Sequence, residues 1–282
     1  MTKPKPTPKP TPKPRTRVAV AQMTSTGDVQ RNLAAVTDLV AQAADERAAL
    51  LVLPECFAYL GPEAGKHAIA EPLPGGGPIL THCRELAVRH RIELVLGGFW
   101  ERGSDPEHSR NACVHLGAGG DVLAVYRKIH LFDVDLSDGT KLRESATVEP
   151  GTEVVASEAP FGMLGLSVCY DLRFPELYRR LVDLGAIALA IPAAFTLTTG
   201  KDHWHVLLRA RAIEAQCYVL AAAQVGVHYG TRASYGHALI CDPWGVVVAE
   251  HGEGTGIAVA TIDPAVVTRV RAQVPSLAHR RL

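Results

Sequence analysis

The chain has 282 residues, of which 47% are hydrophobic, and this is enough apolar material for one large domain with a sizeable core. The composition excludes collagen, coiled coils and wholesale disorder. The formal net charge is zero, but residues 1–17 carry six basic side chains and no acidic one, so the other 265 residues have a net charge of −6. A nucleic-acid-binding surface would need a basic patch on the folded part, and we therefore expect no nucleic-acid partner.

Proline occupies every second position from residue 4 to residue 14. Because proline fixes φ and has no backbone N–H, neither a helix nor a sheet can form there. We predict that residues 1–16 are a disordered Pro/Lys-rich arm and that residues 17–282 form a single domain. A solvated extension is the simplest interpretation of the arm, while a basic tether for an acidic partner and a PxxP-type ligand stay open.

The sequence contains no signal for a membrane or for export. The arm lacks the apolar segment of a secretory signal, and no apolar run reaches the roughly 18–20 residues that span a bilayer. The six cysteines form no CxxC or CxxH pair, which argues against zinc ribbons and redox motifs. We expect a cytoplasmic protein with reduced cysteines and no membrane partner.

In the first half of the domain, short apolar runs alternate with an amphipathic pattern of period 3–4. A Gly/Pro-rich loop is predicted at residues 61–78. The predicted strands are residues 18–21, 50–53, 93–100, 111–116 and 121–127, and the predicted helices are residues 29–47 and 79–90.

The second half repeats this alternation, with a hairpin around residues 242–245. The predicted strands are residues 164–168, 187–191, 218–224, 238–241, 246–249 and 256–262, and the predicted helices are residues 175–184, 203–216 and 264–272. Paired hairpins interrupt a simple βαβ rhythm, so one α/β domain with two sheets fits better than a single doubly wound sheet.

Several common site signatures are absent. Gly75-Gly76-Gly77 is followed by Pro78 and not by Gly-Lys-Ser/Thr, so it is no phosphate loop, and the chain has no GxSxG elbow. His203-Trp204-His205 has side chains that could bind a metal, but apart from Asp202 no carboxylate or cysteine partner lies nearby in the sequence. We predict that this segment packs at the start of a helix, and we predict no metal site.

Polar residues directly follow three apolar strands. Glu55 comes after residues 50–54, Lys128 after residues 122–127 and Cys169 after residues 164–168. Strand ends are where sites collect in α/β proteins. A lone buried cysteine is usually a small hydrophobic residue, and a lone glutamate or lysine is usually a cap or a surface charge. The combination of the three carries the hypothesis of a catalytic site.

The three neighbourhoods together resemble the nitrilase (carbon–nitrogen hydrolase) superfamily and its Glu-Lys-Cys triad. The similar motifs are residues 53–57 (LPECF), 126–133 (YRKIHLFD) and 165–177 (GLSVCYDLRFPEL), and the similarity extends over residues 16–282. The resemblance implies a four-layer αββα sandwich in a single domain, and a homodimer or higher oligomer. It implies no metal and no cofactor.

Later segments resemble the Nit branch of this superfamily, the subgroup that hydrolyses deaminated glutathione. They are residues 194–195, 199–200, 203–204, 207–214, 216–218, 234–237 (SYGH) and 242–245 (DPWG), whereas residues 196–198 and 201–202 depart from the pattern beside the site. The resemblance implies a metabolite-repair amidase acting on deaminated glutathione or a similar α-keto-acid amide. An ω-amidase, a general aliphatic amidase and an inactive binding scaffold stay open.

The resemblance assigns roles that chemistry supports. A nucleophile at Cys169 divides amide hydrolysis into formation and hydrolysis of a thioester, which releases a carboxylate and ammonia. Glu55 is the general base, and Lys128 with the backbone N–H of Tyr170 stabilises the oxyanion. By resemblance, Glu144 positions Lys128; without the resemblance, it would be interpreted as a surface carboxylate.

Four further residues complete the predicted site. We predict that the following residues bind the substrate, although aromatic packing in the core explains the large ones equally well: Phe195, Thr199, His203 and Trp204.

Overall fold

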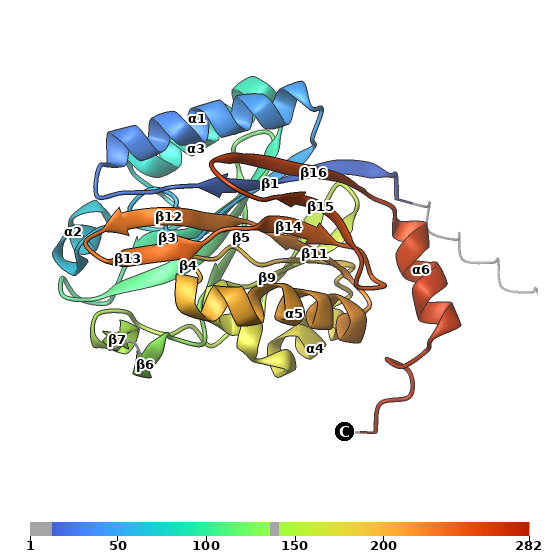
Figure 1. The fold of residues 1–282 in the computed structure, drawn as a ribbon. Coiled ribbons are helices and arrows are strands. Elements are labelled where there is room, and N and C mark those ends of the chain that lie inside the picture. The colour runs from blue at the N-terminus through green and yellow to red at the C-terminus, as the bar shows by residue number, and fades with distance from the viewer. Residues whose placement is uncertain (1–12, 136–140, 282) are drawn as a thin grey trace, which may run out of the picture.

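The computed structural model describes residues 13–135 and 141–281 and has four layers (Figure 1). The predicted α/β fold with two sheets in an αββα sandwich is confirmed. Residues 1–12 of the predicted arm lie outside the described residues. The first strand starts at Thr16, one residue inside the predicted arm.

The first sheet has eight strands, with β16 pairing antiparallel to β1 along most of its length. Its order is β13 (Arg232–Tyr235), β12 (Ala223–Tyr229), β1 (Thr16–Met23), β2 (Leu50–Leu53), β3 (Glu93–Arg102), β4 (Ser109–Leu116) and β5 (Val122–Arg127), with β16 (Gly256–Ile262) beside β1.

The second sheet has six strands, and a separate two-stranded ribbon lies outside both sheets. The six strands are β15 (Val247–His251), β14 (Ala238–Cys241), β11 (Tyr218–Ala221), β10 (Ala188–Ala190), β9 (Gly162–Leu166) and β8 (Ala156–Ala159), and the ribbon is β6 (Asp133–Asp135) with β7 (Lys141–Arg143).

Helices cover the outer faces of the two sheets (Figure 1). The first sheet is covered by α1 (Val29–Asp45) and α3 (Pro78–His90), and the second by α4 (Pro175–Asp183) and α5 (Leu197–Ala215). The other helices are α2 (Glu63–Ile69), α6 (Pro264–Gln273) and two 3₁₀ turns, Glu144–Ala146 and Cys169–Arg173. None of the described helices is both long enough and apolar enough to cross a membrane.

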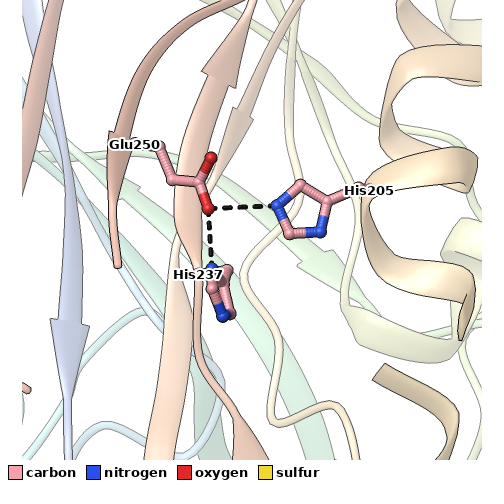
Figure 2. Close-up of side chains that lie close together, drawn as sticks. All are labelled: His205, His237 and Glu250. Atoms are coloured by element: carbon pink, nitrogen blue, oxygen red, sulfur yellow. Dashed lines mark hydrogen bonds and ion pairs between the residues drawn. The ribbon is translucent and has the colours of Figure 1, made fainter. Parts of the chain in front are cut away.

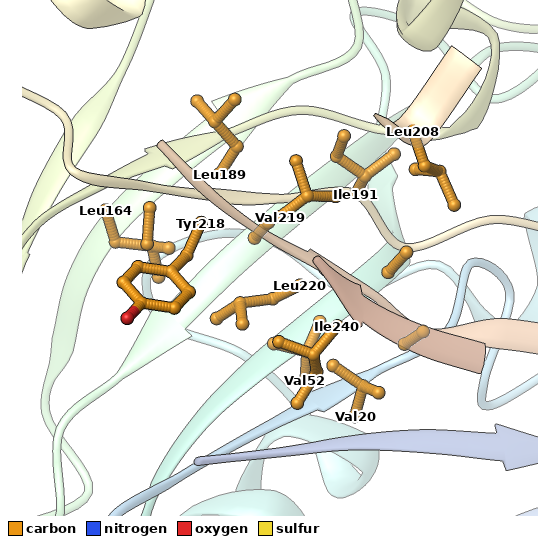
Figure 3. Close-up of a cluster of buried hydrophobic side chains, with 14 of the residues drawn as sticks. Val20, Val52, Leu164, Leu189, Ile191, Leu208, Tyr218, Val219, Leu220 and Ile240 are labelled. Atoms are coloured by element: carbon orange, nitrogen blue, oxygen red, sulfur yellow. The ribbon is translucent and has the colours of Figure 1, made fainter. Parts of the chain in front are cut away.

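Alternation along the strands explains the layers. Val18 and Val20 of β1 point into the core between the sheets, whereas Ala19 and Ala21 point toward α1 and α3. Successive strand residues face opposite sides, so a strand buried on both faces reads as a continuous apolar run. Figure 3 shows part of the core between the sheets, with Val20 and Val52 of the first sheet and Leu220 and Ile240 of the second.

Four local predictions differ from the structure. The predicted loop at residues 61–78 contains α2, and α5 begins at Leu197 rather than at residue 203. The predicted strand 218–224 is two strands, β11 and β12, which belong to different sheets. The sequence analysis also missed β8, β13 and the β6–β7 ribbon, because short strands near turns lack a periodic pattern.

The strand directions define one end of the sandwich as the location of the candidate site. β2 is parallel to β3, and two successive antiparallel pairings bring β5 back to the same direction. In the second sheet, β9, β10 and β11 are mutually parallel. Residues that follow β2 and β5 therefore emerge at the same edge of the first sheet.

Candidate active site

Glu55, Lys128 and Cys169 line one cavity of about 270 Å³ together with Glu144. Glu55 follows β2, Lys128 follows β5, and Cys169 begins the 3₁₀ turn two residues after β9. All but Glu144 are buried. The volume is near the lower end for small-molecule sites, which run from roughly 300 to 1,000 Å³. We call these four residues the lysine–carboxylate cluster.

Lys128 joins two carboxylates in the lysine–carboxylate cluster. Its Nζ lies 3.1 Å from Glu55 Oε1 and 2.8 Å from Glu144 Oε2. Asn111 Nδ2 donates to the same two residues, at 3.0 Å to Glu55 Oε1 and 3.1 Å to Glu144 Oε1. The second oxygen of Glu55 accepts the N–H of Ala194 at 3.0 Å. Buried charges are tolerated when they are paired and hydrogen-bonded in this way.

The electrostatic environment keeps Lys128 charged and Glu55 ionised. Burial alone would lower the pKa of Lys128, but the carboxylates of Glu144 and Glu55 outweigh burial and raise that pKa well above its ordinary value. Burial alone would raise the pKa of Glu55, but Lys128 and hydrogen bonds from Cys169, Lys128 and Asn111 lower it below its ordinary value.

The surroundings of Cys169, in contrast, favour the uncharged form of its side chain. Burial and the neighbouring Glu55 carboxylate raise the pKa of its thiol well above the ordinary value, and Lys128 offsets this only in part. The thiol and the Glu55 carboxylate line the same cavity. At neutral pH the cluster therefore holds a neutral thiol next to an ionised carboxylate, which is a nucleophile paired with its base.

The backbone at Cys169 is held in an unusual conformation. Its φ is +47°, a left-handed value that non-glycine residues rarely adopt. The Cys169 N–H donates to Pro192 O at 2.9 Å. Buried Asp171 accepts the Val168 N–H at 2.8 Å and the Tyr126 hydroxyl at 2.8 Å, so it ties the turn to β5. The turn directs the thiol into the cavity from a rigid support.

Glu55 is positioned by a close backbone contact with β3. Gly98 has φ +59°, and a Cβ there would lie 2.6 Å from Glu55 Cγ and 2.5 Å from the nitrogen of Cys56. Only glycine fits this position. Gln224 Nε2 also donates to the carbonyl oxygen of Glu55 at 2.9 Å.

Comparison with known proteins agrees with this geometry. Residues 17–272 match the carbon-nitrogen hydrolase family. The chain belongs to this family, which is part of the nitrilase superfamily. It is 45% identical over 265 residues to a deaminated glutathione amidase of Synechocystis, covering 93% of this chain and 97% of that protein. It is 46% identical to the deaminated glutathione amidase of Mus musculus, covering 94% of this chain and 83% of that protein.

Solved structures give the same family. The crystal structure of the NitFhit protein of C. elegans has a TM-score of 0.90 and 41% identity. The match covers 96% of this chain and 66% of that chain, so the present chain spans about two thirds of NitFhit. As a carbon–nitrogen hydrolase with relatives that are amidases, this protein hydrolyses C–N amide bonds.

A small recess beside Cys169 gathers other predicted residues of this carbon–nitrogen hydrolase. Tyr170, Phe195 and Thr199 line it together with Arg173. His203 lies outside both the cavity and the recess, where its Nδ1 is 3.2 Å from Arg173 Nη1. The prediction that His203 binds the substrate is therefore not supported by this position.

Trp204 does not reach the cavity. Its side chain is fully buried, its Nε1 donates to His237 O at 2.8 Å, and its ring lies 5.1 Å from that of Phe195. The prediction that Trp204 contacts the substrate is not supported by this position. Trp204 instead supports Phe195 from behind, because the helix α5 points this side chain into the core.

The sequence analysis missed two residues of the site. Asn111 hydrogen-bonds both carboxylates, and its signal was an amide directly before the apolar residues 112–114 of its strand. Arg232 lines the cavity and donates to Ala194 O at 3.2 Å. Within residues 13–135 and 141–281, no carboxylate forms an ion pair with Arg232. It follows β12 by a tight turn, and nothing in its local sequence indicates the cavity.

Proposed function

We propose that this carbon–nitrogen hydrolase is an amidase that uses Cys169 as its nucleophile and cleaves deaminated glutathione or a similar α-keto-acid amide. The observation that carries the proposal is the single cavity that the Cys169 thiol, the Glu55 carboxylate and the Lys128 ammonium line together, with Lys128 Nζ 3.1 Å from Glu55 Oε1. This arrangement supplies a nucleophile, a base and a fixed positive charge in one small cavity.

In the first half of the reaction, Glu55 removes the proton of the Cys169 thiol while the sulfur attacks the amide carbon. Negative charge then develops on the carbonyl oxygen, and Lys128 stabilises it with the backbone N–H of Tyr170. Protonated Glu55 gives the proton to the departing amine as the C–N bond breaks. The product of this half is a thioester on Cys169 and a free amine.

In the second half, ionised Glu55 removes a proton from water, which attacks the thioester carbon. The tetrahedral intermediate collapses to a carboxylic acid, and Glu55 returns the proton to the Cys169 sulfur. Glu144 fixes Lys128 throughout, since it accepts from Nζ at 2.8 Å and is itself held by Asn111. Glu144 is a positioning residue in this scheme.

Two properties of the chain support an acidic substrate. The relatives with 45–46% identity are named deaminated glutathione amidase. Arg232 in the cavity wall and Arg173 in the recess offer guanidinium groups to the carboxylates of an α-keto acid or a peptide end.

The leaving group depends on the substrate. Deaminated glutathione has no primary carboxamide, so hydrolysis of its γ-amide releases the amine of cysteinylglycine and not ammonia. The expectation of ammonia release therefore applies only to primary ω-amides such as α-ketoglutaramate. The assay must follow both products.

The experiment compares wild type, Cys169→Ala and Cys56→Ala on deaminated glutathione, α-ketoglutaramate and simple aliphatic amides. Cys56 also lines the cavity and is the rival thiol. We expect wild type to prefer deaminated glutathione and Cys169→Ala to lose at least ~10⁴-fold in kcat. A preference for α-ketoglutaramate would make the protein an ω-amidase, and activity on simple amides alone would make it an aliphatic amidase. No activity on any of them would favour an inactive binding scaffold. Loss of activity in Cys56→Ala but not in Cys169→Ala would assign the nucleophile to Cys56.

We further propose a homodimer formed through the outer face of α5. Val206, Ile213 and Trp244 are large apolar side chains that are at least half exposed there, and the turn of Trp244 packs on this helix because Arg209 Nε donates to Gly245 O at 2.8 Å. Exposed apolar patches of this kind mark interfaces. Sedimentation of wild type and Val206→Glu tests the proposal, and a monomeric wild type would contradict it.

We also propose a cytoplasmic location and a domain of residues 17–282 preceded by an arm of residues 1–16. All six cysteines are buried and free, which suits a reducing compartment. The family match starts at residue 17. Cleavage of the arm with a protease, followed by an activity assay, tests the boundary, because loss of activity would place the arm within the enzyme.

A further inference from the structure

A second cluster of ionisable side chains lies away from the cavity, at the outer side of the second sheet. It consists of His205 from α5, His237 from the turn between β13 and β14, and Glu250 from β15 (Figure 2). We call these three residues the two-histidine cluster. None of them lines the cavity of Cys169.

Both imidazole rings point at one carboxylate oxygen. His205 Nε2 lies 3.0 Å from Glu250 Oε1, and His237 Nδ1 lies 2.6 Å from the same atom (Figure 2). The three possible ligand atoms lie within 4.8 Å of one another. A helix and both sides of the β14–β15 hairpin thus bring their ligand atoms close to a common point.

The neighbouring groups hold the rings in place. Tyr235 stacks on His237 with ring centroids 4.5 Å apart, and it meets His205 edge-on at 6.0 Å. His237 has φ +61°, which is unusual for a non-glycine residue. The three side chains are each about one third exposed, so an ion can reach them from solvent.

These distances suit a transition-metal ion. Zinc binds imidazole nitrogen and carboxylate oxygen at roughly 2.0–2.2 Å, which separates tetrahedral ligand atoms by ~3.4 Å. To reach this separation, the contact between His205 and Glu250 needs to lengthen by only a few tenths of an ångström. The contact between His237 and Glu250 needs to lengthen by somewhat under 1 Å. Two histidines and one glutamate, with water as the fourth ligand, are an established zinc ligand set.

A second group with suitable donors, formed by Asp105, His108 and Glu149, makes a useful contrast. There Arg110 already pairs with Glu149 at 2.6 Å, and only one imidazole is available. In the two-histidine cluster, no lysine or arginine within residues 13–135 and 141–281 forms an ion pair with Glu250. A cation therefore has no competitor at Glu250 other than the histidines that would be its ligands.

We propose that His205, His237 and Glu250 bind one divalent first-row transition-metal ion, of which Zn²⁺ is the best match. The ion replaces the protons that the two rings now share with Glu250, and it links α5 to the β14–β15 hairpin. The ion thereby joins a helix to the sheet that the helix covers, and water occupies its fourth position. The proposal is independent of the amidase activity and goes beyond it.

The test uses the full chain carrying Cys169→Ala, so that metal cannot bind to that thiol. Protein freed of metal with a chelator is titrated with Zn²⁺ by calorimetry and with Co²⁺ by absorption spectroscopy. We expect one ion per chain, a Co²⁺ spectrum without a sulfur-to-metal band, and a thermal midpoint that rises by several degrees with Zn²⁺.

The variants His205→Gln and Glu250→Gln should each weaken Zn²⁺ binding at least ~10-fold and remove the thermal shift. The matched control His108→Gln, in the other group of donors, should bind Zn²⁺ as the parent does. Circular dichroism in chelator establishes that each variant is folded. Absence of binding by the parent, equal binding by His205→Gln, or a cobalt–sulfur band would each overturn the proposal.

Discussion

The lysine–carboxylate cluster and the two-histidine cluster both bring acid and base side chains together, but they differ in burial. In the first, the side chains of Lys128 and Glu55 are 2% and 7% exposed. In the second, the side chains of His205 and Glu250 are about one third exposed. The first is assembled from residues that follow β2, β5 and β9, and the second from residues of α5, the β13–β14 turn and β15.

This difference determines how each cluster responds to the loss of a charge. Water can approach His205 and Glu250, so a missing partner there is replaced by solvent. Water cannot solvate Lys128 in the same way, so Glu55 and Glu144 depend on its charge. The buried lysine–carboxylate cluster is suited to catalysis with charges held in place, and the half-exposed two-histidine cluster is suited to reversible binding of an ion.

The strongest test of the comparison removes the buried cation. Lys128→Met leaves Glu55 and Glu144 facing each other, and we expect the free energy of unfolding to fall by about 3–5 kcal/mol together with loss of activity. Urea denaturation at neutral pH measures the change. At that pH the contribution of Lys128 is fully present, because its raised pKa means that the contribution disappears only as pH rises above the ordinary lysine range.

The matched control for this variant is Arg17→Met. Arg17 pairs with Glu46 on the surface, where both side chains are about half exposed. We expect a loss of at most ~1 kcal/mol. Equal losses for the two variants would mean that burial does not distinguish these ion pairs.

The second test concerns the base. We expect Glu55→Gln to lower kcat by ~10²–10⁴-fold, because the amide cannot accept the thiol proton. Since Lys128 lowers the pKa of Glu55, wild-type kcat/KM should fall on the acid side only below pH 4.5, the ordinary value for glutamate. Since the pKa of Cys169 is raised above its ordinary 9.0, no loss is expected on the basic side until above pH 9. A profile with an acid limb near pH 6–7 would contradict this assignment.

Much of the buried site could be predicted because strand ends are visible in the sequence. Glu55, Lys128 and Cys169 each follow an apolar run, and parallel strands deliver such residues to one edge. The strands 50–53 and 256–262 have the predicted bounds, because continuous apolar runs between turn signals define them well.

The rest depends on contacts between distant segments. Asn111 reaches Glu55 across 56 residues of sequence, and no local pattern shows that its amide turns toward a carboxylate. Apart from Asp202, His205 has no carboxylate nearby in the sequence, and the fold supplies Glu250 from 45 residues away. The helix that carries His205 begins six residues earlier than predicted, at Leu197, because β-branched Thr198 and Thr199 and then Gly200 weaken the helical signal there.

A buried histidine sharpens the comparison with the two half-exposed ones. His228 is held between Ser25 O and Ser234 Oγ, each 2.8 Å away, and burial lowers its pKa to about 4. The unfolded chain binds this proton near pH 6.5, so stability from His228 is complete above that pH and is lost as pH falls toward 4. We expect a loss of about 3 kcal/mol across this range.

The measurement is urea denaturation at pH 7 and pH 4 for wild type, His228→Gln and His205→Gln. His228→Gln should remove that part of the acid destabilisation, whereas His205→Gln should keep it. The same pH dependence in all three proteins would show that other groups cause it.

The smallest effect is expected at the two-histidine cluster itself. In chelator, Glu250→Gln should cost less than ~1 kcal/mol of unfolding free energy, because water replaces the lost contacts of His205 and His237. Urea denaturation at pH 7 measures this cost, and addition of Zn²⁺ to wild type in the same experiment separates the contribution of the ion from that of the hydrogen bonds. If Glu250→Gln lowered the free energy of unfolding by about 3 kcal/mol in chelator, Glu250 would behave like the buried charges. The contrast between the lysine–carboxylate cluster and the two-histidine cluster would then fail.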